Sequence, residues 1–138
     1  MRLQGKIALI TSAENPCGRA IAIGFAREGA HCVVLDTETQ RAEQLAAEVR
    51  SLGRRAVALQ CDATKKSQVE DVVRRTVVEF GRIDVLLNCS ALTREGGFLN
   101  LTAETFDECI DRGPKECAKS SPPESGSAGR FVRYEPYR

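Results

Sequence analysis

The chain has 138 residues, 42% of them hydrophobic, and a formal net charge of +1. This length suits one domain with a packed core, and the near-neutral charge does not favour partners such as nucleic acid or an anionic membrane. No apolar run approaches the roughly 20 residues of a membrane span, and the amino terminus lacks a signal-peptide core, so we expect a cytoplasmic protein.

The stretch from Lys6 to Ala22 predicts a strand, a loop and a helix. Residues 7–11 are apolar or β-branched, a polar loop with Pro16 and Gly18 follows, and residues 19–25 resume an apolar pattern. A helix that follows a buried parallel strand presents free N–H groups and a positive dipole end. The loop is therefore a candidate phosphate site, and the alternative is a mere strand-to-helix connection.

A second buried strand, residues 31–36, follows Gly29 and ends at Asp36. In a dinucleotide-binding fold, an acid some 18 residues after the last glycine accepts the ribose 2′-hydroxyl and repels a 2′-phosphate. No compensating arginine is evident, so Asp36 predicts NAD in preference to NADP. The alternative is that Asp36 helps to start the next helix, which Thr37 and Gln40 could cap as a box.

Further alternation of strands and helices is predicted along the chain. The expected elements are a covering helix over 39–52, a strand over 56–60, a helix over 67–80, a strand with its lead-in over 82–88, and a short helix, capped by Thr102, that runs through Phe106 to Ile110 or Asp111. Ser67 and Glu70 have the spacing of a capping box at the start of the third helix.

Residues 3–30 resemble the opening of the short-chain dehydrogenase/reductase family. The family motif Thr-Gly-x-x-x-Gly-x-Gly appears here as Thr11-Ser12-Ala-Glu-Asn15-Pro16-Cys17-Gly18, in which only the third glycine is present. The resemblance implies a cofactor pyrophosphate site formed by Ser12, Asn15, Cys17 and Gly18. Ser12 adds a Cβ, and Pro16 removes a backbone donor from that loop.

Two later segments carry the same resemblance. Asp62 and Ala63 match the family's Asp-Val/Ala-Thr turn, which implies that the Asp62 carboxylate faces the adenine amino group. The alternative is a carboxylate that caps its own turn. Residues 80–91, FGRIDVLLNCSA, are similar to the family's FGRIDVLVNNAG. Asn88 matches the sheet-stabilising asparagine of that motif. The next three residues are Cys-Ser-Ala in place of the family's Asn-Ala-Gly, and the resemblance implies that Ser90 lies beside the cofactor.

The resemblance implies an α/β fold, a Rossmann-like parallel sheet with helices on both faces, truncated to about four strands in the order 3-2-1-4. The resemblance covers about residues 3–111, and the predicted Rossmann-like half-domain is residues 1–111. Residues 112–138 are polar and rich in Ser, Pro and Gly, and we expect them to be a disordered tail. The family's Tyr-x-x-x-Lys does not occur, because neither Tyr134 nor Tyr137 has a lysine four residues later.

The resemblance implies an NAD(P)-dependent oxidoreductase that transfers hydride between the cofactor and a small-molecule alcohol/carbonyl pair. Without the catalytic set, we expect this chain to be a truncated form that is inactive or nearly so. The alternative is a non-catalytic nucleotide-binding or subunit-interaction fragment. Its fourth strand would lie at an open edge of the sheet, where a homo-oligomer could form.

The six cysteines, at positions 17, 32, 61, 89, 109 and 117, contain no Cys-x-x-Cys pair. Together with a single histidine, His31, they do not predict a zinc site. We expect reduced thiols that are mostly buried as small hydrophobic residues.

Overall fold

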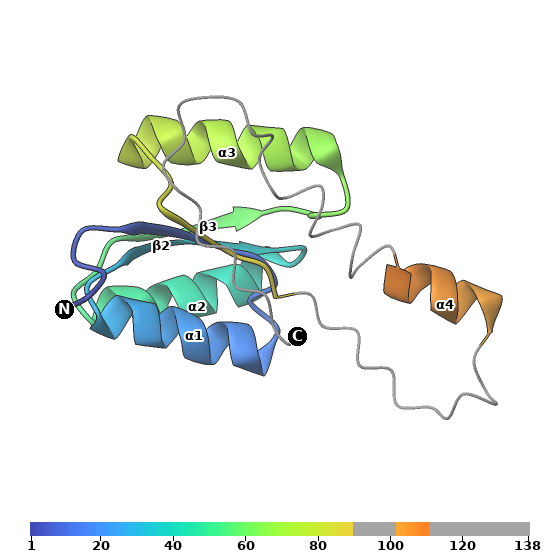
Figure 1. Ribbon diagram of the computed structural model, residues 1–138, viewed down its shortest axis with the longest axis horizontal. Coiled ribbons are helices and arrows are strands. Elements are labelled where there is room, and N and C mark those ends of the chain that lie inside the picture. Colours follow the sequence, from blue (N-terminus) through green and yellow to red (C-terminus); the bar gives the residue numbers. More distant parts are fainter. Residues whose placement is uncertain (90–101, 111–138) are drawn as a thin grey trace.

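The computed structural model describes residues 1–89 and 102–110 (Figure 1). Within them the elements run β1 (Ile7–Ile10), α1 (Pro16–Arg27), β2 (His31–Asp36), α2 (Thr39–Ser51), β3 (Ala56–Gln60), α3 (Lys66–Phe80), β4 (Val85–Leu87) and α4 (Ala103–Ile110). The predicted tail lies outside the described residues, so the domain boundary at 111 stays a prediction.

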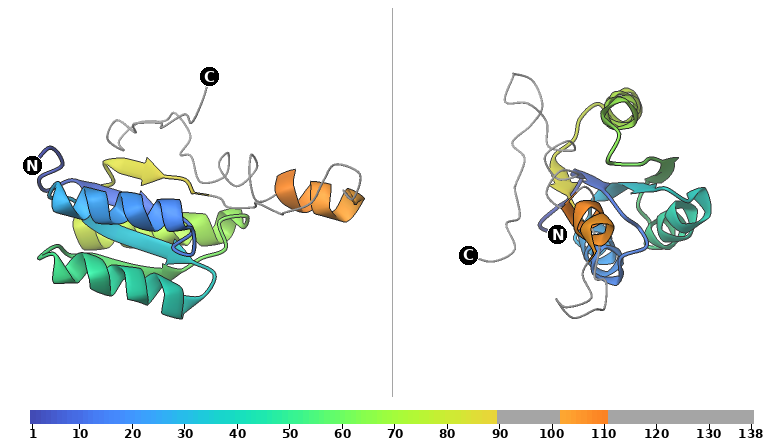
Figure 2. Two further views of the ribbon diagram at one scale, coloured as in Figure 1. Left: turned by 90° about the horizontal axis from the view of Figure 1, so that it is seen from below. Right: turned by 90° about the vertical axis from the view of Figure 1, so that its right-hand side faces the viewer.

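The four strands form one parallel sheet in the order β3-β2-β1-β4, which confirms the expected topology. Helices α1 and α2 cover one face of this sheet and α3 covers the other (Figures 1 and 2). Such a parallel arrangement, with each strand joined to the next by a helix, is typical of a Rossmann-like α/β domain.

Alternate strand residues point to the two faces of the sheet and make two cores. Ala8, Ile10 and Val34 pack with buried residues of α1 and α2. Leu9 and Val33 pack on the opposite face with buried residues of α3. Because both faces are covered, the strands are continuously apolar rather than alternating with polar residues.

Helix α1 begins at Pro16, three residues earlier than the sequence pattern predicts. Proline suits the first helical position, because an N–H there has no intrahelical partner and its absence costs no hydrogen bond. Asn15 is the N-cap, and its side chain accepts the N–H of Cys17 at 2.9 Å. At the other end, Gly29 adopts a left-handed φ of 98°, as predicted for the residue that ends this helix.

The predicted capping box of α3 is wrong. The helix begins at Lys66, its N-cap is Lys65, and no side-chain cap bond forms there. The side chain of Gln68 instead accepts the backbone N–H of Asp62 at 2.7 Å, so the first turn of α3 is tied to the turn that precedes it.

The capping box suggested for α2 does not form either. Its N-cap is Glu38, which makes no side-chain cap bond. The predicted end of the same helix differs by one residue, since α2 ends at Ser51 with Leu52 as C-cap. Among the described helices, none is long and apolar enough to cross a membrane.

Candidate functional site

Hydrogen bonds between the carboxyl ends of the strands bring the predicted site residues to one edge of the sheet. The N–H of Thr11 donates to the carbonyl of Leu87 at 3.0 Å, and the hydroxyl of Thr11 accepts the N–H of Cys89 at 3.1 Å. On the other side of β1, the N–H of Cys61 donates to the carbonyl of Asp36 at 2.9 Å. The segments that follow all four strands therefore start from one edge.

The β1–α1 loop contains a strained residue at its first position. Ser12 has a φ of 58°, which places a side chain in the left-handed region that glycine adopts freely. At the other end of the loop, the N-cap bond from Cys17 to Asn15 occupies an amide that a phosphate would otherwise meet. The loop therefore has a glycine-like backbone conformation at residue 12 and one amide that is already hydrogen-bonded within the loop.

Gly18 in α1 lies close to the segments that follow β1 and β4. A Cβ at this position would lie 3.1 Å from the Cβ of Cys89 and 3.2 Å from the carbonyl oxygen of Ser12. The one glycine that matches the family motif is thus at a close packing contact of α1, which is the role of the third glycine in a dinucleotide-binding turn.

Asp36 is only 3% exposed and accepts hydrogen bonds on both carboxylate oxygens. Oδ2 accepts the N–H of Glu14 at 3.0 Å, which fastens the β1–α1 loop to the end of β2. Oδ1 accepts the N–H of Glu38, the N-cap of α2, at 2.9 Å. The bond to Glu38 agrees with the alternative interpretation, that Asp36 helps to start α2. The role of Asp36 in binding a ribose stays a prediction.

An arginine does lie beside Asp36, so the expectation that none was available is wrong. Arg41 donates from Nε to Asp36 Oδ1 at 3.3 Å. Its Nη1 lies 3.1 Å from Glu14 Oε2 and its Nη2 lies 2.9 Å from Glu38 Oε1. Burial acts to lower the pKa of Arg41, but the three carboxylates raise it above its ordinary value. The sequence gives only a weak signal for this contact, because it is the geometry of the turn into α2 that brings Arg41 close to Asp36.

Asp62 caps its own turn after β3. Its Oδ1 accepts the N–H of Thr64 at 3.0 Å and the Thr64 hydroxyl at 2.6 Å, and Lys65 Nζ lies 3.9 Å from Oδ2. Ala63 is buried and its side chain belongs to the core beneath α3, so only its backbone is placed to meet a cofactor. The contact of Asp62 with adenine stays a prediction.

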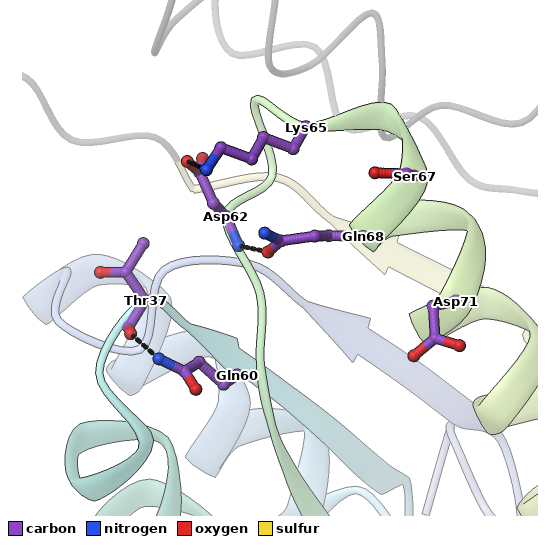
Figure 3. A pocket seen from close by; sticks show the side chains of 7 residues that line it. All are labelled: Thr37, Gln60, Asp62, Lys65, Ser67, Gln68 and Asp71. Atoms are coloured by element: carbon purple, nitrogen blue, oxygen red, sulfur yellow. Dashed lines mark hydrogen bonds and ion pairs between the residues drawn. The ribbon is translucent and has the colours of Figure 1, made fainter.

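A polar cavity of about 630 Å³ opens between the ends of β2 and β3 and the first turns of α3 (Figure 3). Its lining residues are Thr37, Gln60, Asp62, Lys65, Ser67, Gln68 and Asp71. Asp62 is the one predicted site residue among them. The cavity therefore adjoins the expected adenine end of the site rather than the β1–α1 loop.

Asn88 follows β4 and is half-buried, whereas Ser90 lies outside the described residues. In the described part of the chain, Cys32 and Cys61 are buried thiols and Cys89 is partly buried, but Cys17 is exposed, contrary to the expected burial. Burial raises the pKa of Cys32 to about 12. Within residues 1–89 and 102–110, no group of three or more His, Cys, Asp or Glu side chains could hold a metal ion.

A parallel sheet in the order β3-β2-β1-β4, with a loop after β1 that leads into a helix and a buried acid at the end of β2, is typical of a Rossmann-like α/β domain. Residues 6–115 match the family described as short chain dehydrogenase. The chain belongs to this family.

Several curated relatives and solved structures are similar to the chain over most of its length. Oxidoreductase UcpA of Salmonella typhimurium is 39% identical over 110 residues, which are 80% of this chain and 41% of that protein. Galactitol 2-dehydrogenase of Agrobacterium fabrum is 36% identical over 117 residues, 83% of this chain and 44% of that protein.

A crystal structure of a short-chain dehydrogenase/reductase from Burkholderia xenovorans superposes with a TM-score of 0.79 at 32% identity. It covers 86% of this chain and 49% of that one. The chain thus spans about half the length of the relatives it matches.

Proposed function

We propose that this chain is the cofactor-binding half of a cytoplasmic, NAD-dependent oxidoreductase acting on a small-molecule alcohol or carbonyl compound. The observation that carries the proposal is the buried carboxylate of Asp36, which lies at the end of β2 and is bonded to the β1–α1 loop. This is the position from which an acid addresses the adenosine ribose in dinucleotide-binding folds. When bound, the nicotinamide cofactor supplies the hydride acceptor or donor.

The residues at the ribose end fit this cofactor. Oδ2 of Asp36 accepts the Glu14 N–H, and a carboxylate oxygen can accept a second bond, from a ribose hydroxyl. The pyrophosphate end fits less well, because Pro16 lacks an N–H and the Cys17 N–H is held by Asn15. We therefore propose weak binding that is driven by the ribose and adenine contacts.

The preference for NAD follows from charge. Glu14, Asp36 and Glu38 surround the one guanidinium of Arg41, so three negative charges and one positive charge leave this cluster at −2. A 2′-phosphate would meet like charge there, whereas a ribose hydroxyl would meet acceptors.

Catalysis by residues 1–138 alone should be slow. Because the printed sequence has no Tyr-x-x-x-Lys, it lacks the family's proton-transfer pair, and general acid–base help is worth about 10²- to 10⁴-fold in rate. We propose that the chain binds NAD and supports little or no turnover by itself.

Calorimetric titration with NAD and NADP tests the binding proposal. The parent chain should bind NAD more tightly than NADP. Asp36→Asn should weaken NAD binding and so reduce the difference between the affinities for the two cofactors. Glu79→Gln is a matched control, since Glu79 pairs with Arg55 beside the start of β2, at the opposite edge of the sheet. Equal binding of both cofactors, or no effect of Asp36→Asn, would remove Asp36 from the ribose role. Robust oxidation of NADH with simple ketones would contradict the expected low turnover.

A second candidate function is association with another subunit. In the described residues β4 pairs with β1 alone, so its other edge has no described strand beside it. An open strand edge can pair with a second chain. Light scattering after size-exclusion chromatography tests this function, and a monomer across the micromolar range would count against it.

A further inference from the structure

We propose that Gln68 is a positioning residue for cofactor binding. Its side chain holds the turn that contains Asp62 against the first turn of α3, at the polar cavity, and so fixes the Asp62 carboxylate before a ligand arrives. The inference rests on the proposed dinucleotide function and names a residue that acts on it through Asp62.

The hydrogen bond between Gln68 and Asp62 is short and connects two different elements. Oε1 of Gln68 accepts the backbone N–H of Asp62 at 2.7 Å, across six residues. The bonds from Thr64 to the Asp62 carboxylate span two residues and stay inside the turn. The carboxylate bonds therefore shape the turn, whereas the bond to Gln68 sets where the turn lies relative to α3.

Helix α3 begins without a side-chain cap, so its connection to the preceding turn depends on other bonds. Its N-cap, Lys65, makes no side-chain cap bond, but the N–H of Lys65 donates to the carbonyl of Asp62 at 2.9 Å. Gln68 adds a second connection in the opposite direction, from the N–H of Asp62 to the helix. Asp62 is thus held to α3 through both of its backbone polar groups.

Asp62 and Gln68 both line the polar cavity of about 630 Å³ (Figure 3). In that view the side chain of Gln68 points toward the backbone of Asp62, and the Asp62 carboxylate lies beside Lys65. A hydrogen bond weakens steeply with poor distance or angle, so a ligand that bonds to this carboxylate gains from a turn that is already fixed. Gln68 therefore lowers the ordering cost of binding at the adenosine end of the proposed site.

Two substitutions of Gln68 test the inference in the full 138-residue chain by calorimetric titration. Methionine has a similar length and helix propensity but lacks the amide oxygen, so Gln68→Met should raise the Kd for NAD about fivefold. Glutamate keeps an oxygen that can accept the Asp62 N–H, so Gln68→Glu should bind NAD nearly as tightly as the parent. ADP-ribose, which lacks the nicotinamide, should lose affinity in Gln68→Met by the same factor as NAD.

Gln44→Met is the matched control for the loss of a glutamine amide. Gln44 is exposed on α2 and does not line the cavity. This variant should leave the Kd of both ligands unchanged. Titrations are compared at a temperature where every variant is folded, so that a loss of stability alone does not alter the Kd.

Hydrogen exchange in the parent chain provides a test that needs no variant. If NAD binds only while the bond between Gln68 and Asp62 is formed, then each local opening that exposes the Asp62 N–H competes with binding. Exchange of this N–H should therefore slow about tenfold at an NAD concentration about ten times the Kd. The N–H of Arg55, which donates to His31 at the opposite edge of the sheet, should slow much less.

The outcomes separate this inference from the proposed function. An unchanged Kd in Gln68→Met, a loss for NAD that ADP-ribose does not share, or a Gln68→Glu variant as weak as Gln68→Met overturns the inference and leaves the proposed function standing. Exchange of the Asp62 N–H that does not respond to NAD overturns it as well, and this measurement decides if Gln68→Met does not fold. If the parent chain binds neither NAD nor ADP-ribose, both are overturned.

Discussion

Gly18 lies against Cys89 so closely that a Cβ at residue 18 would be 3.1 Å from the Cβ of Cys89. We predict that Gly18→Ala lowers the free energy of unfolding by about 1–2 kcal/mol, because the backbone carbonyl of Ser12 limits how far the neighbours can move. Chemical denaturation of the parent and variant measures this difference.

Gly24 provides the control for that substitution, since it lies in the same helix and a Cβ there would meet nothing within 4 Å. Gly24→Ala should raise the free energy of unfolding by about 0.5–1 kcal/mol, the usual gain from replacing glycine inside a helix. Equal effects of the two substitutions would show that α1 does not approach the sheet as closely as described.

The left-handed backbone of Ser12 should make glycine tolerable at this position. Ser12→Gly relieves a strain of about 1 kcal/mol and loses a similar amount because glycine frees the unfolded chain, so stability should change by less than about 1 kcal/mol. Ser12→Val, with a β-branched side chain at φ 58°, should destabilise the fold by more than about 1 kcal/mol. Thermal unfolding of both variants checks whether the glycine variant is the more stable of the two. A valine variant as stable as the parent would contradict the backbone conformation assigned to residue 12.

Restoring two glycines should strengthen cofactor binding at the β1–α1 loop. The double variant Ser12→Gly with Pro16→Gly returns one backbone N–H, and a hydrogen bond to a charged group is worth about 1.5–3 kcal/mol, so NAD should bind roughly ten- to a hundredfold more tightly. Stability should fall slightly, since Pro16 suits the first position of α1. If the folded variant binds NAD no better by calorimetry, then residues 12–18 form a structural turn.

His31 should make the fold less stable in mild acid. Burial, and then the charges of Arg55 and Arg54, lower the pKa of His31, and its Nδ1 accepts the N–H of Arg55 at 3.0 Å. In the unfolded chain the imidazole keeps a pKa near 6.5 and takes up its proton first. The contribution of His31 is therefore complete above about pH 6.5 and is lost as the pH falls below it, with a slope of at most about 1.4 kcal/mol per pH unit.

Denaturation between pH 5 and pH 8 tests this dependence, and His31→Asn is the matched variant because the amide Oδ1 occupies the place of the imidazole Nδ1 and can accept the Arg55 N–H. That variant should show a flatter pH profile over this range. The sequence has one histidine, so its imidazole resonance can be followed without overlap. A folded-state pKa above 6.5 would reverse the predicted sign.

The sequence pattern is sufficient to predict the strands and helices of the core and their order along the chain. Continuous apolar runs such as residues 32–35 predict strands covered on both faces, and the observed sheet buries them on both faces. The ends of the helices were less predictable. Pro16 looks like a loop residue in the sequence, yet it is the first residue of α1, because Asn15 provides the cap.

The candidate site was predictable only in part, because its side chains have competing local partners. Asp36 and Asp62 lie at or just after strand ends, as predicted. The sequence leaves two roles open for each carboxylate, and the contacts with backbone N–H groups are those of the local role, at the start of α2 and in the turn after β3. Arg41 was missed because its contact with Asp36 depends on the angle at which α2 leaves β2. Helix geometry alone does not pair residues across that junction.

The order β3-β2-β1-β4 places the first strand to be synthesised in the middle of the sheet. One edge of β1 pairs with β2, which follows it closely in the sequence. On the other side, the N–H of Ile7 donates to the carboxylate of Asp84, which lies 77 residues later. Contacts of such long sequence separation slow folding, since a long loop must close before they form. A nascent chain on the ribosome would therefore expose the open edge of β1 until β4 emerged.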